Sequence, residues 1–158
     1  MGIKNCNQKI VDIRIFNSND NYIEFDNGYA IDGAIQIYLS KTIIAFVWNF
    51  ELENFEFQEN RNLETSHFYE INLNNLPKIK NLIGQEIDSL KFIENEFHTL
   101  VDYTMKTGKI KLVSGIELTF ISKETIKISC SNFKINSLKN IPTNISPDLQ
   151  GNILIEIS

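Results

Sequence analysis

Three residues with alternating spacing are the nearest thing to an active site in this chain. Glu94, Glu96 and His98 would share one face of an extended strand. Two carboxylates beside an imidazole could bind a metal ion or perform acid–base chemistry. The same stretch occupies the place where the first half of the chain has a polar turn, Asn17–Asn21, which favours a solvated loop. The other histidine, His67, has no matching ligand near it in the sequence.

The motifs that usually mark catalysis are missing from the sequence. It contains no Gly-rich phosphate loop, no Ser nucleophile elbow, no HExxH and no CxxC. The two cysteines, Cys6 and Cys130, are too far apart in sequence to predict a metal site or a disulfide framework. Cys130 lies on the apolar side of a strand pattern, as a buried free thiol would. We therefore predict a non-enzymatic protein with no catalytic residues, no metal and no cofactor.

The elements that would position a site form two similar halves. A hairpin at Gly33–Phe50 (GAIQIYLSKTIIAFVWNF) returns at Gly115–Phe133 (GIELTFISKETIKISCSNF), each with a Ser-Lys turn and an Asn-Phe end. Strand patterns before and after the hairpin recur in the same order with similar turns between them. The matched stretches are Ile10–Phe16 with Ile87–Ile93, Tyr22–Phe25 with Phe97–Met105, Tyr29–Ile31 with Lys109–Val113, and Phe68–Leu73 with Ile153–Ile157.

These patterns predict a mainly β protein, or an α+β protein with one short helix between its halves. Period-2 alternation of apolar residues indicates the strands. The stretch Leu76–Gly84 begins with Leu-Pro, has apolar residues at helical spacing and ends in Gly, which predicts a helical linker. We expect two tandem antiparallel β repeats, 1–76 and 77–158, in a pseudo-two-fold arrangement. Because a unit of about 75 residues buries only a small core, the two should pack as one compact unit.

The two hairpins differ on one face of their second strand. The predicted core face is apolar in both, with Ile43, Ala45 and Val47 matching Ile126, Ile128 and Cys130. The other face is apolar or aromatic in the first half and polar in the second, with Ile44, Phe46, Trp48 and Tyr38 against Lys127, Ser129, Ser131 and Thr119. We therefore expect this face to be solvated in the second half and covered in the first. The cover is either another part of the chain, or a ligand or partner.

The charge of the chain is unevenly distributed. The net charge is −5; residues 1–76 hold 5 basic and 11 acidic side chains, and residues 77–158 hold 10 and 9. This balance disfavours nucleic acid as a partner, because neutralising phosphates needs clustered Lys and Arg. The longest apolar run, Ile43–Trp48, is far short of the roughly 20 residues of a membrane helix, and the N-terminal stretch lacks the apolar core of a secretory signal. We expect a cytoplasmic protein that does not bind membranes.

An acidic segment follows the aromatic strand of the first hairpin. Its carboxylates Glu51, Glu53, Glu56 and Glu59 alternate irregularly with Phe55 and Phe57. Such a segment is either a solvated edge whose charges block unwanted strand pairing or a surface that attracts a basic protein. In the second case the aromatic residues would anchor the partner, namely Tyr38, Phe46, Trp48, Phe55 and Phe57.

A small, acidic, β-rich chain with duplicated G-[IA]-x-[IL] hairpins and no catalytic motif resembles the immunity proteins of bacterial polymorphic toxin systems. The resemblance is one of type, so no functional residue is carried over from it. It implies a protein that neutralises a cognate toxin by blocking the basic active-site region of its catalytic domain. Two other functions stay open: a small-molecule or lipid-binding β-module with Tyr38, Phe46 and Trp48 lining its cavity, and a hydrolase that uses Glu94, Glu96 and His98.

Overall fold

A computed structural model describes the chain except for residues 1–3, 19–21, 50–53, 102–104 and 131–152. The described residues form eleven strands in one antiparallel sheet, a 3-10 turn η1 (Leu73–Asn75) and one short helix α1 (Pro77–Lys80). The predicted mainly β class is confirmed. The strands are β1 (Lys4–Asn17), β2 (Ile23–Phe25), β3 (Gly28–Ile31), β4 (Ala34–Leu39), β5 (Ile43–Asn49), β6 (Asn54–Glu59), β7 (Tyr69–Ile71), β8 (Glu86–Val101), β9 (Met105–Phe120), β10 (Thr125–Cys130) and β11 (Ile153–Ile157).

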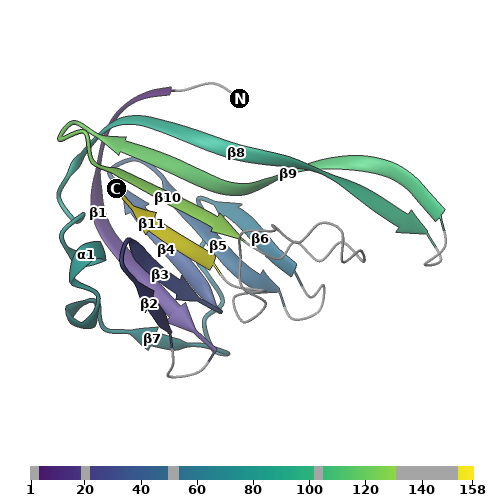
Figure 1. Cartoon of the computed structure of the whole chain (residues 1–158), viewed down its shortest axis with the longest axis horizontal. Coiled ribbons are helices and arrows are strands. Elements are labelled where there is room, and N and C mark those ends of the chain that lie inside the picture. Colours follow the sequence, from purple (N-terminus) through teal and green to yellow (C-terminus); the bar gives the residue numbers. More distant parts are fainter. Residues whose placement is uncertain (1–3, 19–21, 50–53, 102–104, 131–152) are drawn as a thin grey trace.

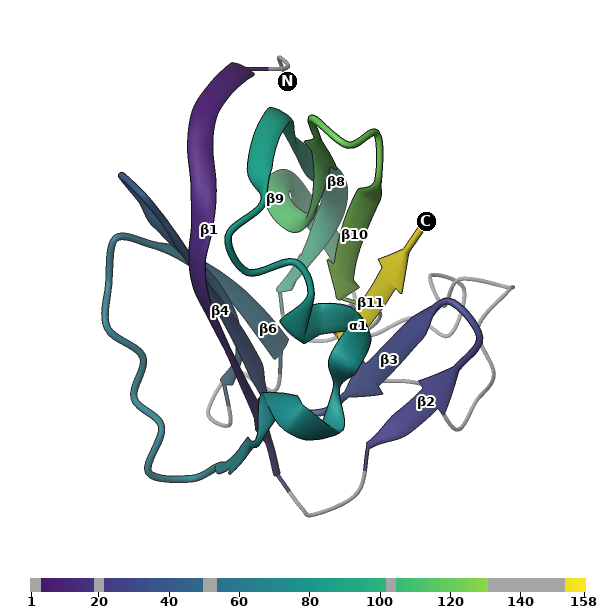
Figure 2. The same cartoon turned by 90° about the vertical axis from the view of Figure 1, so that its left-hand side faces the viewer.

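The sheet curls over so that its inner face encloses the core. Its strand order is β2-β3-β11-β10-β9-β8-β1-β4-β5-β6, and β7 pairs with one end of β1. In Figure 1 and Figure 2, β1, β4, β5 and β6 form one layer, while β8 to β11 with β3 and β2 form the facing layer. The main core cluster contains side chains from both halves of the chain. The two layers therefore share one core.

Two groups of four strands pair in the same order. In the first group β1, β4, β5 and β6 pair in turn, and in the second β8, β9, β10 and β11 do so, with β1 joined to β8 in the middle. A bulge falls at the same place in both, between Ile10 and Asp12 of β1 and between Ile87 and Ser89 of β8. The predicted tandem arrangement requires such a repeated pairing, and an origin by duplication stays a prediction.

The Ser-Lys turns of the two hairpins are also held by matching glutamines. Gln8 of β1 accepts a hydrogen bond from the Lys41 amide at 3.0 Å. Gln85, just before β8, accepts one from the Ser122 hydroxyl at 3.2 Å. Each turn is thus hydrogen-bonded to the glutamine two residues before Ile10 of β1 or Ile87 of β8.

The halves diverge after their first strand. β1 ends at Asn17, and the short β2–β3 hairpin leaves it to pair with β11, whereas β8 and β9 run on for 16 residues each. Side-chain hydrogen bonds stabilise the end of β1. The Asn17 side chain accepts one from the Asp32 amide at 2.7 Å, and the Asp32 carboxylate accepts one from the Ser18 amide at 3.0 Å. Gly33 is required there, since a Cβ would lie 2.4 Å from the Phe16 carbonyl oxygen. The long β8–β9 hairpin projects from the rest of the described fold (Figure 1).

One predicted correspondence between the halves is wrong. The sequence pattern matches Ile153–Ile157 to Phe68–Leu73. In the structure β11 lies beside β10 as β6 lies beside β5, whereas β7 pairs with β1. The counterpart of β11 is therefore β6, which lies in the acidic segment where carboxylates obscure the strand pattern.

The predicted faces of the first hairpin are reversed. Ile44 and Phe46 are 1% and 0% exposed in the main core, whereas Val47 belongs to a separate cluster on the other side of the sheet. In the second hairpin Ile126 and Ile128 face the main core, as predicted.

Turn length explains the reversal. The sequence match makes the second turn two residues longer than the first. The paired residues Tyr38 and Ile43 are separated by residues 39–42, and the paired Thr119 and Thr125 by residues 120–124, so the true difference is one residue. A one-residue slip moves every side chain of a strand to the opposite face.

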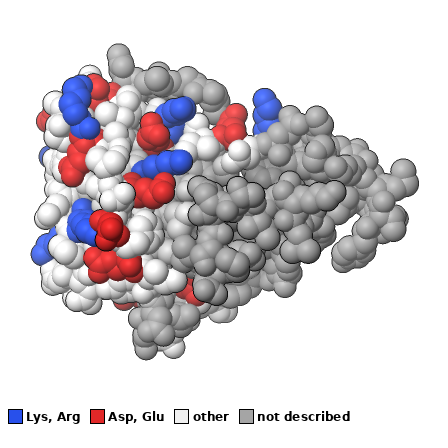
Figure 3. Space-filling view, viewed as in Figure 1, with Lys and Arg blue, Asp and Glu red and all other residues white. Residues whose placement is uncertain are grey.

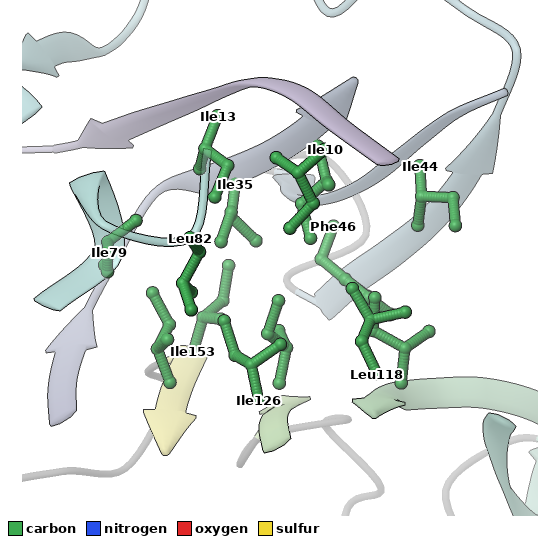
Figure 4. Close-up of a cluster of buried hydrophobic side chains, with 14 of the residues drawn as sticks. Ile10, Ile13, Ile35, Ile44, Phe46, Ile79, Leu82, Leu118, Ile126 and Ile153 are labelled. Carbon is green, nitrogen blue, oxygen red and sulfur yellow. The ribbon is translucent and has the colours of Figure 1, made fainter. Parts of the chain in front are cut away.

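Helix α1 closes one end of the core. Pro77 begins it, and Gly84 ends the linker with a φ of 88°, so the predicted helical linker is confirmed. Ile79 and Leu82 are 0% and 1% exposed, and Leu82 points toward Ile153 in Figure 4. Burying these two side chains stabilises the fold by about 1.5–3 kcal/mol each. Within the described residues, no helix is long and apolar enough to cross a membrane.

Candidate functional site

Strand β6 is one end of the sheet and carries most of the described residues that the sequence singles out. Among the described residues it pairs with β5 alone. Its side chains alternate, so that Phe55 and Phe57 join the main core while Glu56 lies on the outer face, opposite Val47. Glu59 ends the strand and is exposed. It pairs with Ile44 and so shares the phase of Phe55 and Phe57, which leaves Glu56 as the carboxylate on the outer face of the described strand.

The backbone of β6 presents donors at the end of the sheet. The Asn60 amide donates to the Ile43 carbonyl at 2.8 Å. Bonded and non-bonded pairs alternate along an antiparallel ladder. The amides of Phe55, Phe57 and Glu59 are out of phase with Asn60 and point away from β5. An incoming strand could accept hydrogen bonds from them.

The aromatic residues predicted to anchor a partner are mostly core residues. Phe46 and Phe55 are 0% and 1% exposed, so they do not form a partner surface. Trp48 and Phe57 are half-buried and pack on these two rings. Trp48 packs edge to face on Phe55, with ring centroids 5.0 Å apart, and Phe57 packs tilted on Phe46 at 5.4 Å. Phe57 also contacts Phe92 of the facing layer at 5.5 Å. The expectation that the aromatic face is covered holds, and the cover is the chain's own second half.

Tyr38 lies on the opposite side of the sheet from Phe46 and Trp48. Its hydroxyl donates to Gln36 Oε1 at 2.9 Å, and the Gln36 amide group donates to the Arg61 carbonyl at 3.3 Å. The three aromatic residues therefore cannot line one cavity. This corrects the hypothesis of a small-molecule or lipid site built from them.

Of the four acidic residues predicted to bind a partner, two are described. Glu59 is exposed and Glu56 is half-buried. Glu51 and Glu53 lie outside the described residues. The described part of the predicted acidic site is thus confined to one strand.

The outer face of the second half carries a row of charges that sequence reasoning missed. Lys91, Glu117, Lys127 and Glu156 are paired in register across β8, β9, β10 and β11, so that the sign alternates from strand to strand. Opposite charges in register contribute roughly 0.2–1 kcal/mol a pair. The sequence reveals that Lys127 is solvated, but it does not give the register that puts these four residues side by side.

A shallow groove of about 600 Å³ lies along this row. Its charged lining residues are Lys91, Lys111, Lys127, Glu94 and Glu117. Three lysines against two glutamates leave little net charge, and in Figure 3 acidic and basic side chains are intermingled on the described surface. The groove therefore does not select a ligand of either sign.

The stretch predicted to be a solvated loop is part of a strand. β8 continues through Glu94, Glu96 and His98, whose backbones pair with Val113, Lys111 and Lys109. Glu94 is exposed, and the side chains of the other two lie outside the described part. Within that part, no group of three or more His, Cys, Asp or Glu side chains could hold a metal ion.

Cys130 is buried with a free thiol, as its place in the strand pattern predicts. Burial raises the pKa of this thiol well above its ordinary value. A thiol that keeps its proton is a poor nucleophile and a poor metal ligand. Cys6 is also buried and free.

Comparison with known proteins leaves the site to be interpreted from its own geometry. The sequence matches no family model and no curated protein, and the fold matches no solved structure. The feature that the described geometry leaves for recognition by a partner protein is therefore strand β6 at the end of the sheet, with Glu56 and Glu59.

Proposed function

We propose that this chain is a non-enzymatic protein-binding module, an immunity protein that neutralises a cognate bacterial toxin. It would bind the basic region around the active site of the toxin's catalytic domain and block it. The observation that carries the proposal is the position of β6: a strand with Glu56 on its outer face and Glu59 exposed at its end is the last strand of the described sheet. The small, acidic, β-rich character of the chain agrees with this function.

The physical logic combines charge with a sheet edge that has no further hydrogen-bonded strand among the described residues. Glu56 and Glu59 would attract a basic surface and speed its approach, since complementary charge mainly raises association rates and specificity. The outward amides of β6 would then add directional hydrogen bonds. Because Phe46 and Phe55 are buried, the half-buried Tyr38, Trp48 and Phe57 are the predicted anchors left for a partner.

This function also sets where the protein works. An immunity protein meets an incoming toxin in the cytoplasm of the cell it protects, so we propose a cytoplasmic location. The partner would be a basic protein rather than a nucleic acid or a membrane, given the net charge of −5.

A growth assay tests the proposal. The chain would be co-expressed with the toxin domain encoded beside it, and survival would be compared for wild type and for Glu56→Lys/Glu59→Lys. We expect wild type to restore growth and to bind the toxin domain, and the variant to weaken binding by at least tenfold, mostly through slower association.

A matched control changes the same charge elsewhere. Glu94→Lys/Glu156→Lys alters two exposed carboxylates of the second half and should leave protection intact. Equal loss in both variants would mean that only overall charge matters. No protection by wild type against the adjoining toxin would contradict the proposed function.

A further inference from the structure

A hollow of about 290 Å³ lies where the two halves of the chain meet, away from the charged row and the groove beside it. Its volume is at the lower end of the roughly 300–1,000 Å³ range of small-molecule sites. Its lining comes from β1, from the start of β8 and from the turns of both hairpins. The lining residues include Gln8, Lys9, Ser40, Glu86, Ile87 and Ile121. Both halves therefore contribute to one cavity.

Four of the lining residues form matching pairs, with one member of each pair from each half. Lys9 of β1 is paired in register with Glu86 of β8. The Ser40 amide donates to the Lys9 carbonyl at 3.1 Å, and the Ile121 amide donates to the Glu86 carbonyl at 3.0 Å. Each half thus brings one strand residue and one turn residue to the hollow in the same hydrogen-bonded arrangement.

The chemistry of these pairs differs between the halves. The first half contributes the ammonium group of Lys9 and the hydroxyl group of Ser40, both of which donate hydrogen bonds. The second half contributes the carboxylate of Glu86, which accepts them, and the apolar side chain of Ile121. The first side of the hollow therefore suits a carboxylate. The second side suits an ammonium group that has an apolar group beside it.

These side chains are available to a ligand. Lys9 and Glu86 are exposed, and among the described residues the side chain of neither forms an ion pair or a hydrogen bond. Ile121 is 57% exposed. A ligand that covered Ile121 would remove apolar surface from water, which favours binding.

The backbone that carries the two charges is held by the sheet. The Ile10 amide donates to the Gln85 carbonyl at 3.0 Å, and the Gly84 amide donates to the Ile10 carbonyl at 2.8 Å. These bonds flank the paired residues Lys9 and Glu86 at the seam between β1 and β8. Side chains that project from a sheet are positioned more closely than side chains on a loop.

We propose that this hollow binds a free α-amino acid with an apolar side chain. The carboxylate of the ligand accepts hydrogen bonds from Lys9 and Ser40, its ammonium group donates to Glu86, and its side chain covers Ile121. A zwitterion gives each of the two opposite charges a partner, whereas a cation would be repelled by Lys9 and an anion by Glu86. This site and the partner surface proposed on β6 are separate, and neither proposal depends on the other.

Binding of L-leucine to the full chain tests the proposal. We expect leucine to shift the backbone amide NMR signals of Ser40 and Ile121, with saturation below about 10 mM. Leucine amide lacks the carboxylate and isocaproate lacks the ammonium group, so each should bind about tenfold more weakly. No saturable shift with leucine, or equal binding of all three compounds, would overturn the proposal.

Two variants test which residue contacts which charge of the ligand. Lys9→Met should weaken leucine binding about tenfold and abolish the preference for leucine over leucine amide. Glu86→Gln should weaken it to a similar extent and abolish the preference for leucine over isocaproate. A general loss of structure would not produce this crosswise pattern. The reverse pattern, or an unchanged preference in both variants, would contradict the assigned contacts.

A matched control removes the same charges from another pair of residues in register. Lys91→Met and Glu117→Gln lie on β8 and β9 in the charged row, so they should leave leucine binding unchanged. If they weaken binding as much as the first two variants do, the overall charge distribution is responsible and the assigned site is wrong. Circular dichroism would confirm that each variant is folded.

A last variant tests the apolar contact. Ile121→Ser should weaken the binding of leucine and leave that of glycine unchanged, because glycine has no side chain to cover Ile121. Equal weakening for both amino acids would contradict the proposed orientation. None of these results bears on protection against a toxin, which the growth assay measures separately.

Discussion

The outer faces of the two four-strand groups have opposite surroundings. Over the first group the segment after β6 crosses the sheet, and its Leu63 and Phe68 pack on Phe16, Ala34 and Val47. Over the second group no such segment lies among the described residues, and the charged row from Lys91 to Glu156 faces outward.

Equivalent residues show what the difference means. Gln36 of β4 and Glu117 of β9 hold the same register position, as do Ala45 of β5 and Lys127 of β10. Gln36 and Ala45 are each 1% exposed, whereas Lys127 is exposed and Glu117 is half-buried. The inner faces keep the same apolar alternation in both groups. We infer that the shared order of strand pairing depends on these inner faces. The outer faces are free to become either a second small core or a solvated surface.

The largest expected effect comes from exchanging the residue types of the two faces. Ala45→Lys should lower the free energy of unfolding by about 3 kcal/mol or more, because it would bury an unpaired ammonium. Lys127→Ala should change it by less than about 0.5 kcal/mol. Urea unfolding followed by tryptophan fluorescence measures both. A small effect of Ala45→Lys would mean that the segment after β6 does not hold its place over the sheet.

A second pair compares the apolar content of the two faces. Phe16 is 2% exposed in the outer cluster of the first group, and Ile93 is its half-buried counterpart on β8. Phe16→Ala should cost about 3–4 kcal/mol through the cavity it leaves, and Ile93→Ala about 1 kcal/mol. Equal costs, measured by thermal unfolding, would show that both faces are buried in solution.

A third pair separates hydrogen bonding from surface charge. Gln36→Ala should cost about 1–2 kcal/mol, since it removes the acceptor of the half-buried Tyr38 hydroxyl and the donor to the Arg61 carbonyl. Glu117→Ala should cost at most about 1 kcal/mol, and the cost should shrink as salt is raised. The free energy of unfolding of both variants would be measured at two salt concentrations. A cost of Gln36→Ala that depends on salt would contradict its assignment to hydrogen bonding.

The smallest effect concerns how the end of the covering segment is tied to β1. Arg14 donates two hydrogen bonds to Glu70 at 2.8 and 2.9 Å, and this pairing lowers the pKa of Glu70. A lowered folded-state pKa contributes stability above the unfolded-state pKa, and the contribution is lost as the pH falls through the folded-state value. Both side chains are partly exposed, so we expect less than about 1 kcal/mol. Wild type and Glu70→Gln should differ at neutral pH and converge in acid; a constant difference would rule out this ion pair as its cause.

Local patterns predict much of the fold. Alternating apolar residues predict the strands, Leu-Pro and Gly84 bound the linker, and the solvated position of Lys127 is visible in the sequence. What could not be predicted is long-range pairing. Nothing local indicates that Tyr29 lies beside Ile155, and one residue in the turn before Thr125 decides which face of the first hairpin is matched to the core.

The candidate site shows the same limit. The acidic character of Glu56 and Glu59 can be predicted. An aromatic strand face, however, has the same sequence pattern whether it packs against a partner or against the chain's own second half. Phe46 and Phe55 are buried because the sheet curls, and curling is a property of the whole sheet.

The pairing of β3 with β11 has a consequence for the order of folding. It joins residues near Tyr29 to residues near Ile155, so it carries the greatest loop-closure cost of any strand pair described. During synthesis β3 emerges long before β11, and until then Tyr29 and Ile31 have no neighbour on that side. We therefore expect the β2–β3 hairpin to be the last part of the sheet to form its native pairing. On an incomplete chain it should be the part of the sheet most accessible to proteases.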